Sequence, residues 1–294
     1  PPLVPEWRDL DEAAALEAAK TTGLLIQGAP GVGKSTWGRQ LVASLRLEGK
    51  VVHVVAKTHL ARKNFQMGAE TADHWCIRYI QNGDCKGVDY IVCEELSQIN
   101  VQLWSQLCVA KMRGCKFICL GDFGQFQSVA ETWAGSPVAA DSLRDSAMLR
   151  ELCGSNRFTL TQNQRSDPPL FEFITSLRPG TPEAKPLAQA LEEARARFPV
   201  TDRPAQWLLV MSHRKRMQHN RLMNQARRPK GALFFRYRPP HGQLSGNQPQ
   251  SMWLWQGITL VGAGGPCPKG ILVVDQAFSS VTVAVLGAVL EAAF

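Results

Sequence analysis

Short apolar stretches alternate with longer amphipathic ones through the first half of the chain. Four stretches are short, almost entirely apolar and bounded by polar residues or glycine, which is typical of strands buried in a sheet. They cover residues 24–27, 51–55, 90–93 and 116–120. Four others repeat apolar positions every three or four residues, which predicts helices that bury one face. They cover residues 10–20, 35–47, 101–111 and 141–152. This alternation predicts an α/β fold, with a mainly parallel sheet and helices on both of its faces.

The second half of the chain has a less regular pattern. The elements expected there are two helices, one buried strand and one small antiparallel pair of strands. They cover residues 187–197 and 214–227 (helices), 207–211 (strand), and 252–261 with 271–278 (pair). The change of pattern places a boundary near residue 159. We therefore predict one domain over residues 1–158 and a second over 159–294, with a small β insertion near 252–280.

The composition is that of a folded globular protein, because 45% of the 294 residues are apolar and only 20% are charged. The N-terminus lacks the basic and then apolar order of a secretory signal. The longest apolar run, over residues 281–294, is too short to span a bilayer. Eight cysteines without C-x-x-C spacing argue against a zinc site and fit a reducing compartment. We therefore expect a soluble intracellular protein with no membrane partner.

The positive charge is concentrated in one segment. The formal net charge of the chain is +8, but residues 201–240 alone contain ten Lys or Arg and one Asp. This segment therefore carries +9, and the remaining 254 residues together carry −1. A local basic surplus of this kind is typical of a surface that binds a phosphate backbone. The alternative interpretation is a solvated helix face that happens to be basic.

A phosphate-binding loop follows the first predicted strand. Residues 28–35 have the pattern G-x-x-x-x-G-K-S and stand between a predicted strand and a predicted helix. In such a loop the backbone N–H groups surround the phosphates, Lys34 reaches the β- and γ-phosphates, and the Ser35 hydroxyl holds Mg²⁺. A chance glycine turn is the alternative, which the strand–loop–helix context disfavours. The expected nucleotide-binding residues are Gly28, Ala29, Pro30, Gly31, Val32, Gly33, Lys34, Ser35 and Thr36.

Polar side chains follow two further predicted strands. Glu94 and Glu95 come directly after the strand over 90–93, and Gln125 follows the strand over 116–120 in the pattern G-D-x-x-Q. One carboxylate is expected to order the water shell of Mg²⁺, and the next to polarise the attacking water. The Gln125 amide is expected to contact the γ-phosphate. Ligands in parallel sheets bind beyond the carboxyl ends of the strands, which is where all three residues are predicted to lie.

Taken together, these motifs resemble those of superfamily 1 DNA helicases, specifically the RecD-like branch. The resemblance rests on the phosphate loop, on E-E-x-S-Q after Cys93, on G-D-x-x-Q after Leu120, and on L-x-x-N-x-R-S over residues 160–166. It implies two RecA-like lobes, the second incomplete here and interrupted by a small β-barrel-like insertion. It also implies that ATP and Mg²⁺ are used and that Arg165 crosses the cleft to the γ-phosphate as an arginine finger.

The resemblance further implies a single-stranded nucleic acid as partner, DNA rather than RNA, with a monomer favoured as the oligomeric state. The residues that match the family's strand-binding segments are Thr58, His59, Thr71, His74, His213 and Asn220. Trp75, Phe123 and Phe126 are aromatic candidates for stacking on bases, although an apolar ring near a strand end more often packs in the core.

The chain departs from the family pattern at several places. Glu94 stands where the family usually has Asp, residues 1–26 contain no Gln to read adenine, and Gln127-Ser128 replaces the usual Pro pair. No segment after residue 258 matches the late Gln-Gly motif or the last Arg motif, so the chain is expected to be truncated before them. The leading hypothesis is an ATP-dependent DNA helicase or translocase. The alternatives are a degenerate nucleotide-gated nucleic-acid-binding protein and an unrelated P-loop ATPase.

Overall fold

A computed structural model describes most of the chain, and it divides into two compact units, Pro1–Pro199 and Val200–Phe294. Each unit is described by itself. For residues 259, 261–264 and 267–273 only the backbone is described. The described residues are 6–125, 128, 132–138, 143–178, 185–200, 208–236, 250–264 and 267–273.

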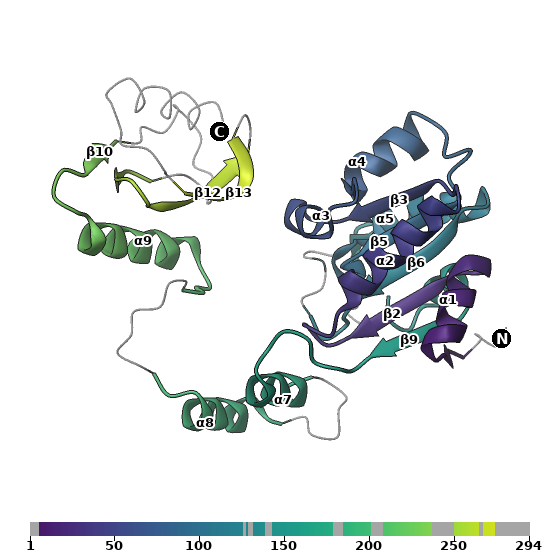
Figure 1. The fold of residues 1–294 in the computed structure, drawn as a ribbon, viewed down its shortest axis with the longest axis horizontal. Helices are drawn as coiled ribbons and strands as arrows, with labels where there is room; N and C mark the ends of the chain where they lie inside the picture. The colour runs from purple at the N-terminus through teal and green to yellow at the C-terminus, as the bar shows by residue number, and fades with distance from the viewer. Residues whose placement is uncertain are drawn as a thin grey trace. The chain divides into compact units, whose positions relative to one another are not determined.

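The first unit is built on a seven-stranded sheet in the order β1-β9-β2-β6-β5-β3-β4, in which every pair of neighbours is parallel (Figure 1). The strands are β1 Arg8–Asp9, β2 Leu24–Gly28, β3 Val52–Ala56, β4 Glu70–Thr71, β5 Tyr90–Glu94, β6 Lys116–Gly121 and β9 Asn156–Leu160. A short antiparallel pair, β7 (Thr132–Trp133) and β8 (Ser136–Pro137), follows β6. The expected parallel sheet is therefore confirmed.

Helices connect these strands and cover both faces of the sheet. They are α1 Glu12–Thr21, α2 Lys34–Leu47, α3 His59–Phe65, α4 Ala72–Cys76, α5 Val101–Met112 and α6 Ala147–Leu152. Two further helices, α7 Pro168–Ser176 and α8 Leu187–Arg197, follow β9, the last strand of the sheet along the chain. A π-helical turn, η1 (Ile77–Gln81), extends α4, and a 3₁₀ turn, η2 (Leu96–Gln98), follows β5. The sequence predicted α1, α2, α5 and α8 closely, because each repeats apolar positions at helical spacing.

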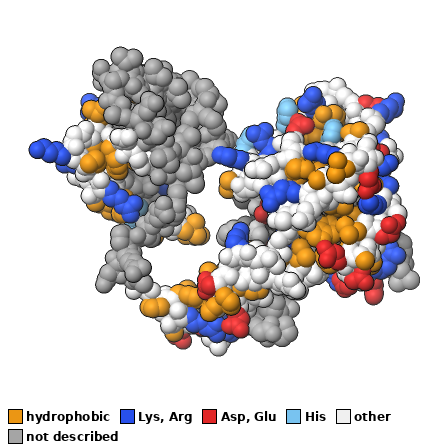
Figure 2. All heavy atoms as spheres, in the orientation of Figure 1, with side chains coloured by type: hydrophobic (Ala, Val, Ile, Leu, Met, Phe, Trp, Pro, Cys, Tyr) orange, Lys and Arg blue, Asp and Glu red, His pale blue; other side chains and the backbone are white. Residues whose placement is uncertain are grey.

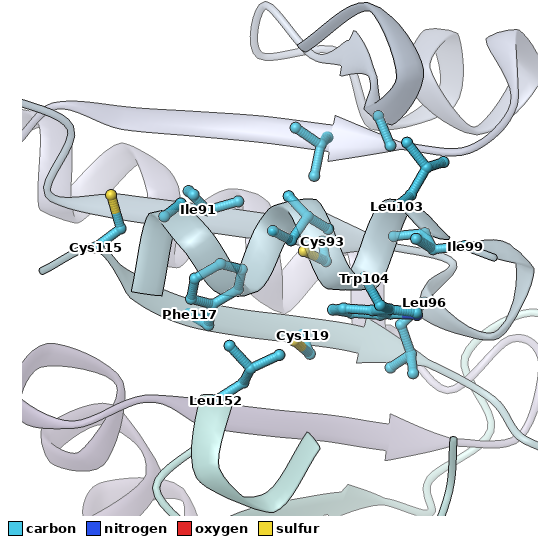
Figure 3. Packing of buried hydrophobic residues seen from close by; sticks show 14 of the residues in the cluster. Ile91, Cys93, Leu96, Ile99, Leu103, Trp104, Cys115, Phe117, Cys119 and Leu152 are labelled. Atoms are coloured by element: carbon cyan, nitrogen blue, oxygen red, sulfur yellow. The ribbon is translucent and has the colours of Figure 1, made fainter. Parts of the chain in front are cut away.

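Two hydrophobic clusters form the core, one on each face of the sheet. Alternate residues of β5 enter different clusters, with Ile91 and Cys93 on one face and Tyr90 and Val92 on the other. Figure 3 shows the first cluster, where Trp104 of α5 packs over β5 and β6. Such two-sided burial explains why the strands are continuous apolar runs and not alternating ones. Buried Cys93 and Cys119 are core residues, as expected.

The second unit contains one long helix and two small antiparallel pairs of strands. Its elements are α9 His213–Arg227, β10 Leu233–Phe235 paired with β11 Met252–Leu254, and β12 Thr259–Gly264 paired with β13 Cys267–Val273. Asn224 joins the helix to β11, because its amide donates to the Trp253 carbonyl and accepts from the Trp253 N–H, both at 2.7 Å. The Trp253 ring packs on Phe234 and lies under the Arg228 guanidinium.

Three expectations need correction or restriction. The boundary predicted between residues 158 and 159 falls inside β9, which pairs with β2, and the first compact unit continues to residue 199. The assignment of 159–294 to a partial second motor domain stays a prediction.

Residues 208–211 form no strand, and Leu209 and Met211 are more than 90% exposed. An apolar run becomes a buried strand only where a neighbouring strand pairs with it. Of the helix expected over 141–152, α6 covers the last six residues, and 139–142 lie outside the described residues.

Within the described part of the chain, none of the helices is long and apolar enough to cross a membrane.

Candidate active site

The loop between β2 and α2 has the backbone that a phosphate cradle needs. Gly33 caps the N-terminus of α2 with φ +91°, in the left-handed region that favours glycine. Gly28 has φ +157°, and a Cβ at this position would lie 2.3 Å from the carbonyl oxygen of Leu160. A side chain at either position would displace the loop. The loop also ends directly at the N-terminus of α2, where backbone N–H groups and the helix dipole favour an anion.

The Lys34 ammonium group lies inside this loop. Its Nζ donates hydrogen bonds to the carbonyl oxygens of Gly28 at 2.9 Å and Ala29 at 3.0 Å. Burial lowers the pKa of Lys34, and the negative charges of Asp122, Glu95 and Glu94 act in the opposite direction. Lys34 is the first residue of α2, and a cation at a helix N-terminus is suited to bind a polyanion such as a nucleotide phosphate chain.

Glu94 and Glu95 bring two carboxylates to the end of β5. Successive residues of a strand point to opposite faces, but Glu95 has φ +52°, in the left-handed region that non-glycine residues seldom adopt. This turn lets both side chains line the same cavity. The Oε2 atoms of Glu94 and Glu95 are buried and have no hydrogen-bond partner in the protein. Buried polar atoms without partners cost free energy, so they point to a ligand or water at this place.

Glu94 also contacts the phosphate loop directly. The Ser35 hydroxyl donates to Oε1 of Glu94 at 2.5 Å. Burial raises the pKa of Glu94 to about 7, and the Ser35 hydrogen bond opposes this rise only in part. Burial also raises the pKa of Glu95, against the effect of Lys34. The site therefore holds carboxyl groups that a bound cation would convert to the ionised form.

The oxygen atoms of Ser35 and Glu94 fit a magnesium ion. Mg²⁺ prefers oxygen ligands and usually takes one or two from the protein, with phosphates and waters supplying the others. The hydroxyl and the carboxylate are adjacent, and the free Oε2 of Glu94 adds an acceptor without a protein partner. Among the described residues, no group of three or more His, Cys, Asp or Glu is arranged to hold a metal ion by itself.

The loop after β6 carries Gln125. Its backbone N–H donates to the carbonyl oxygen of Asp122 at 3.2 Å, and the Gly124 N–H donates to the Asp122 carboxylate at 2.9 Å. Asp122 itself is buried and accepts two hydrogen bonds from Arg178, which follows α7. The sequence gives no sign of this role for Arg178, because Arg178 and Asp122 are 56 positions apart along the chain.

The loop after β9 places Arg165 beside the phosphate loop. The Gln164 N–H donates to the Gly31 carbonyl at 2.8 Å, and the Arg165 side chain packs against Gly31. Asn163 shapes this loop, since its side-chain oxygen accepts from the N–H groups of Arg165 and Ser166 at 3.2 and 3.1 Å. An Asn that hydrogen-bonds to the following backbone forms a local turn. This explains why Asn precedes Arg by two residues in the L-x-x-N-x-R-S motif.

These loops surround one cavity of about 670 Å³. All of the residues predicted to be catalytic line it, and they come from four separate strand ends. The lining residues are Pro30, Gly31, Gly33, Lys34, Ser35, Thr36, Glu94, Glu95, Gly121, Gln125, Gln164 and Arg165. Gly28, Ala29 and Val32 of the predicted nucleotide-binding set do not line the cavity. They form the inner side of the loop, where Val32 and Ala29 are buried.

Four of the predicted strand-binding residues lie at or just after the carboxyl ends of β3 and β4, whose last residues, Ala56 and Thr71, pair with each other. Thr58 and Thr71 both cap helices, since their hydroxyls accept from the N–H groups of Ala61 and His74. His59 is exposed. His74 is also exposed, and its Nδ1 lies 3.0 Å from Oε2 of Glu70. The two threonines therefore have a structural role in addition to any contact with a strand.

The other two predicted strand-binding residues, His213 and Asn220, are exposed on α9 in the second unit. Trp75, a candidate for base stacking, is fully buried and donates from Nε1 to Nδ1 of His53 at 2.9 Å. It is a core residue, as the alternative interpretation held. Phe123 packs against the same cluster, and Phe126 lies outside the described residues.

Replacement of Glu94 by Gln is expected to stabilise the folded protein more at pH 8 than at pH 5. The pKa of about 7 lies above the ordinary value of 4.5 for a glutamate, so the folded state binds this proton more tightly than the unfolded state does. Stability is therefore lost as pH rises through about 7. One pKa unit corresponds to about 1.4 kcal/mol, so the full effect is about 3 kcal/mol. Gln is neutral at every pH, so Glu94→Gln does not lose this stability as the pH rises.

The measurement is the midpoint of thermal unfolding from pH 5 to pH 8 for wild type and Glu94→Gln without nucleotide. Glu17→Gln is the matched control, because Glu17 is exposed on α1. A difference between Glu94→Gln and wild type that stays constant over this pH range would contradict the raised pKa.

Comparison with known proteins agrees with this geometry. A family model described as an AAA domain matches residues 11–195, more than half of the chain. No curated protein sequence matches significantly. Pif1 helicase from Candida albicans has a similar structure, with a TM-score of 0.60 and 19% identity, and the match covers 96% of this chain and 72% of that one.

Bacteroides Pif1 bound to single-stranded DNA gives a TM-score of 0.56 at 13% identity, covering 85% of this chain and 64% of that one. Bacteroides Pif1 in complex with ADP-AlF₃ and single-stranded DNA gives 0.54 at 12% identity, covering 91% and 69%. At identities this low, the structural similarity shows the fold alone. The RecA-like P-loop fold expected from the sequence is confirmed, whereas the RecD-like branch is not distinguished from Pif1. The chain therefore belongs to the AAA-domain family, and its fold is similar to that of the Pif1 helicases.

Proposed function

We propose that this chain is an ATP-dependent DNA helicase or translocase, which hydrolyses Mg²⁺-bound ATP in the cavity between the phosphate loop and Arg165. The observation that carries the proposal is the convergence of Lys34, Glu95, Gln125 and Arg165 on that one cavity. In hydrolysis, water attacks the γ-phosphorus, the bond to the oxygen that bridges the β- and γ-phosphorus breaks, and ADP and phosphate leave. Such a reaction needs positioned groups and charge stabilisation more than covalent chemistry.

Each residue has a separate role in this proposal. Lys34 holds the β- and γ-phosphates, and Ser35 and Glu94 hold Mg²⁺, which neutralises phosphate charge when bound. Glu95 orients the attacking water and accepts its proton, which fits a carboxylate whose pKa burial has raised. Gln125 contacts the γ-phosphate. Arg165 stabilises the charge that develops on it in the transition state.

Single-stranded DNA is the proposed partner. The solved Bacteroides Pif1 structures contain single-stranded DNA, and they share this fold. In the second unit, residues 208–236 contain eight Lys or Arg and no Asp or Glu. Figure 2 shows blue Lys and Arg side chains on the surface of this unit. Thr58, His59, Thr71 and His74 are proposed to contact the sugar-phosphate backbone from the first unit, and His213 and Asn220 from α9.

The test of this proposal is the rate of ATP hydrolysis with and without single-stranded DNA. We expect single-stranded DNA to stimulate the ATPase, because the backbone contacts couple strand binding to the cavity. Removing two cations of α9 in Arg214→Ala/Lys215→Ala should raise the DNA concentration needed for half-maximal stimulation. It should also lower the salt dependence of binding by about 1.4 logarithmic units per tenfold change in salt, about 0.7 for each cation removed.

The matched control is Lys50→Ala/Lys86→Ala, which removes two exposed cations that precede β3 and β5. Those positions lie at the amino ends of the strands, on the edge of the sheet opposite the cavity. The control should be stimulated like wild type. ATP hydrolysis that no nucleic acid changes would contradict the proposed helicase. DNA binding without any phosphate release would instead support a nucleotide-gated binding protein.

A further inference from the structure

A buried ion pair joins the loop of Gln125 to the end of α7. Nη1 of Arg178 donates to Oδ2 of Asp122 at 2.7 Å, and Nη2 donates to Oδ1 at 2.5 Å. The Asp122 side chain is 0% exposed and that of Arg178 is 23% exposed. Two parallel hydrogen bonds from one guanidinium to one carboxylate fix both direction and distance. A pair taken out of water in this way is costly to break on one side only.

Asp122 determines the shape of the loop that carries Gln125. Its carboxylate accepts from the Gly124 N–H at 2.9 Å, and its carbonyl accepts from the Gln125 N–H at 3.2 Å. The guanidinium of Arg178 also packs on the loop, since a Cβ on Gly124 would lie 3.2 Å from Cζ of Arg178. The backbone that presents Gln125 to the cavity is therefore held between Asp122 and Arg178.

The other end of α7 is tied to the loop that carries Arg165. Asp167 caps the helix by accepting from the Leu170 N–H at 3.2 Å. Asn163 holds the two residues before the cap, since its side chain bonds to the N–H groups of Arg165 and Ser166 and to the Ser166 carbonyl. One nine-residue helix, α7 (Figure 1), thus connects the two loops whose Gln125 and Arg165 line the cavity.

We propose that Arg178 is a positioning residue for ATP hydrolysis, which acts through Asp122 on Gln125. The ion pair holds the Gln125 loop in the arrangement that contacts the γ-phosphate, and α7 makes this loop and the Arg165 loop respond together. The role rests on the proposed ATPase function. Arginine is required because the ammonium group of lysine is a single point of charge and cannot make two parallel bonds to a carboxylate.

The experiment compares Arg178→Lys and the neutral pair Asp122→Asn/Arg178→Gln with wild type. The neutral pair leaves no uncompensated buried charge, so it still tests the role of Arg178 if the single variant fails to fold. We would measure kcat and KM for ATP, together with the affinities for fluorescent ADP and for a non-hydrolysable ATP analogue. Arg197→Ala is the control, because Arg197 pairs with Glu193 and Glu172 away from the cavity.

We expect both variants to lose kcat by about 10- to 100-fold, the usual effect of removing a partner that orients an active-site group. Affinity for the ATP analogue should fall about tenfold, and affinity for ADP should not change, because only ATP has a γ-phosphate. A general loss of structure would lower both affinities equally. Combining Arg178→Lys with Gln125→Ala should cost no more kcat than Gln125→Ala alone, since the two act on one contact.

Two results would overturn the positioning role. One is that Arg178→Lys keeps the kcat of wild type and binds the ATP analogue as strongly, relative to ADP, as wild type does. The other is an equal loss of affinity for ADP and for the ATP analogue in both variants. If the wild-type protein binds nucleotides but does not hydrolyse ATP, the proposed function fails. The positioning role is then still decided by whether Arg178→Lys weakens the ATP analogue selectively.

Discussion

Lys34→Ala is expected to lower kcat/KM for ATP by about a thousandfold or more, leaving hydrolysis near background. Removal of one preorganised donor to a developing charge typically costs about 10²–10³ in rate. Lys34 also contributes to binding, because its Nζ lies inside the phosphate loop on the carbonyls of Gly28 and Ala29. Alanine cannot replace this charge. The measurement is phosphate release at saturating single-stranded DNA over a range of ATP concentrations.

Lys86→Ala is the control for the charge itself, since Lys86 is 90% exposed and pairs with Asp84. It should behave like wild type. Thermal unfolding of Lys34→Ala must accompany the assay, because Asp122, Glu95 and Glu94 then lose a nearby cation. A folded Lys34→Ala protein that hydrolyses ATP within tenfold of wild type would refute the assignment of the phosphate loop as the catalytic nucleotide site.

Arg165→Ala is expected to lower kcat by about 10³-fold, the lower end of the range for an arginine finger. Affinity for ADP should change little, because the role assigned to Arg165 is contact with the γ-phosphate. The loop should keep its shape in this variant, since Asn163 and the Gln164 N–H hold it through contacts that the Arg165 side chain does not make. Single-turnover hydrolysis separates this loss of chemistry from any loss of binding.

Arg195→Ala serves as the control for Arg165, because Arg195 is exposed on α8 and does not line the cavity. Arg165→Lys keeps a positive charge and should recover part of the rate but not all of it, since lysine lacks the planar fork of donors. Equal losses of ADP affinity and kcat in Arg165→Ala would show that this residue supports binding and not the transition state.

Much of the first unit was predictable because its elements carry local signals. The strands β2, β5 and β6 are apolar runs that end at the motif residues, and parallel strands bring their carboxyl ends to one edge of a sheet. That rule alone placed Lys34, Glu94 and Gln125 around one site. The helices α3, α4 and α7 went unpredicted, although Thr58, Thr71 and Asp167-Pro168 are recognisable helix starts.

β9 shows the limit of the local pattern. Residues 156–160 read Asn-Arg-Phe-Thr-Leu, and the burial is correspondingly mixed, so the apolar signal is weak. Its place between β1 and β2 depends on pairing with strands more than 100 residues away. The opposite error occurred at residues 207–211, where the apolar signal is strong but the described residues 208–211 form no strand. In both cases a strand forms only where a neighbouring strand pairs with the segment, whatever the apolar pattern of the segment itself.

The chemistry of the phosphate loop, the order of the motifs and the concentration of positive charge followed from the amino-acid sequence, because each depends on residues that are close along the chain. The left-handed turn at Glu95, the raised pKa of Glu94 and the ion pair between Asp122 and Arg178 became visible only in the folded protein. Burial and contact between distant segments create them, and neither is encoded in the spacing of a motif. The residues for nucleotide chemistry can thus be recognised from short segments of this sequence. The arrangement that links Gln125 to Arg165 depends on how distant segments pack in the folded protein.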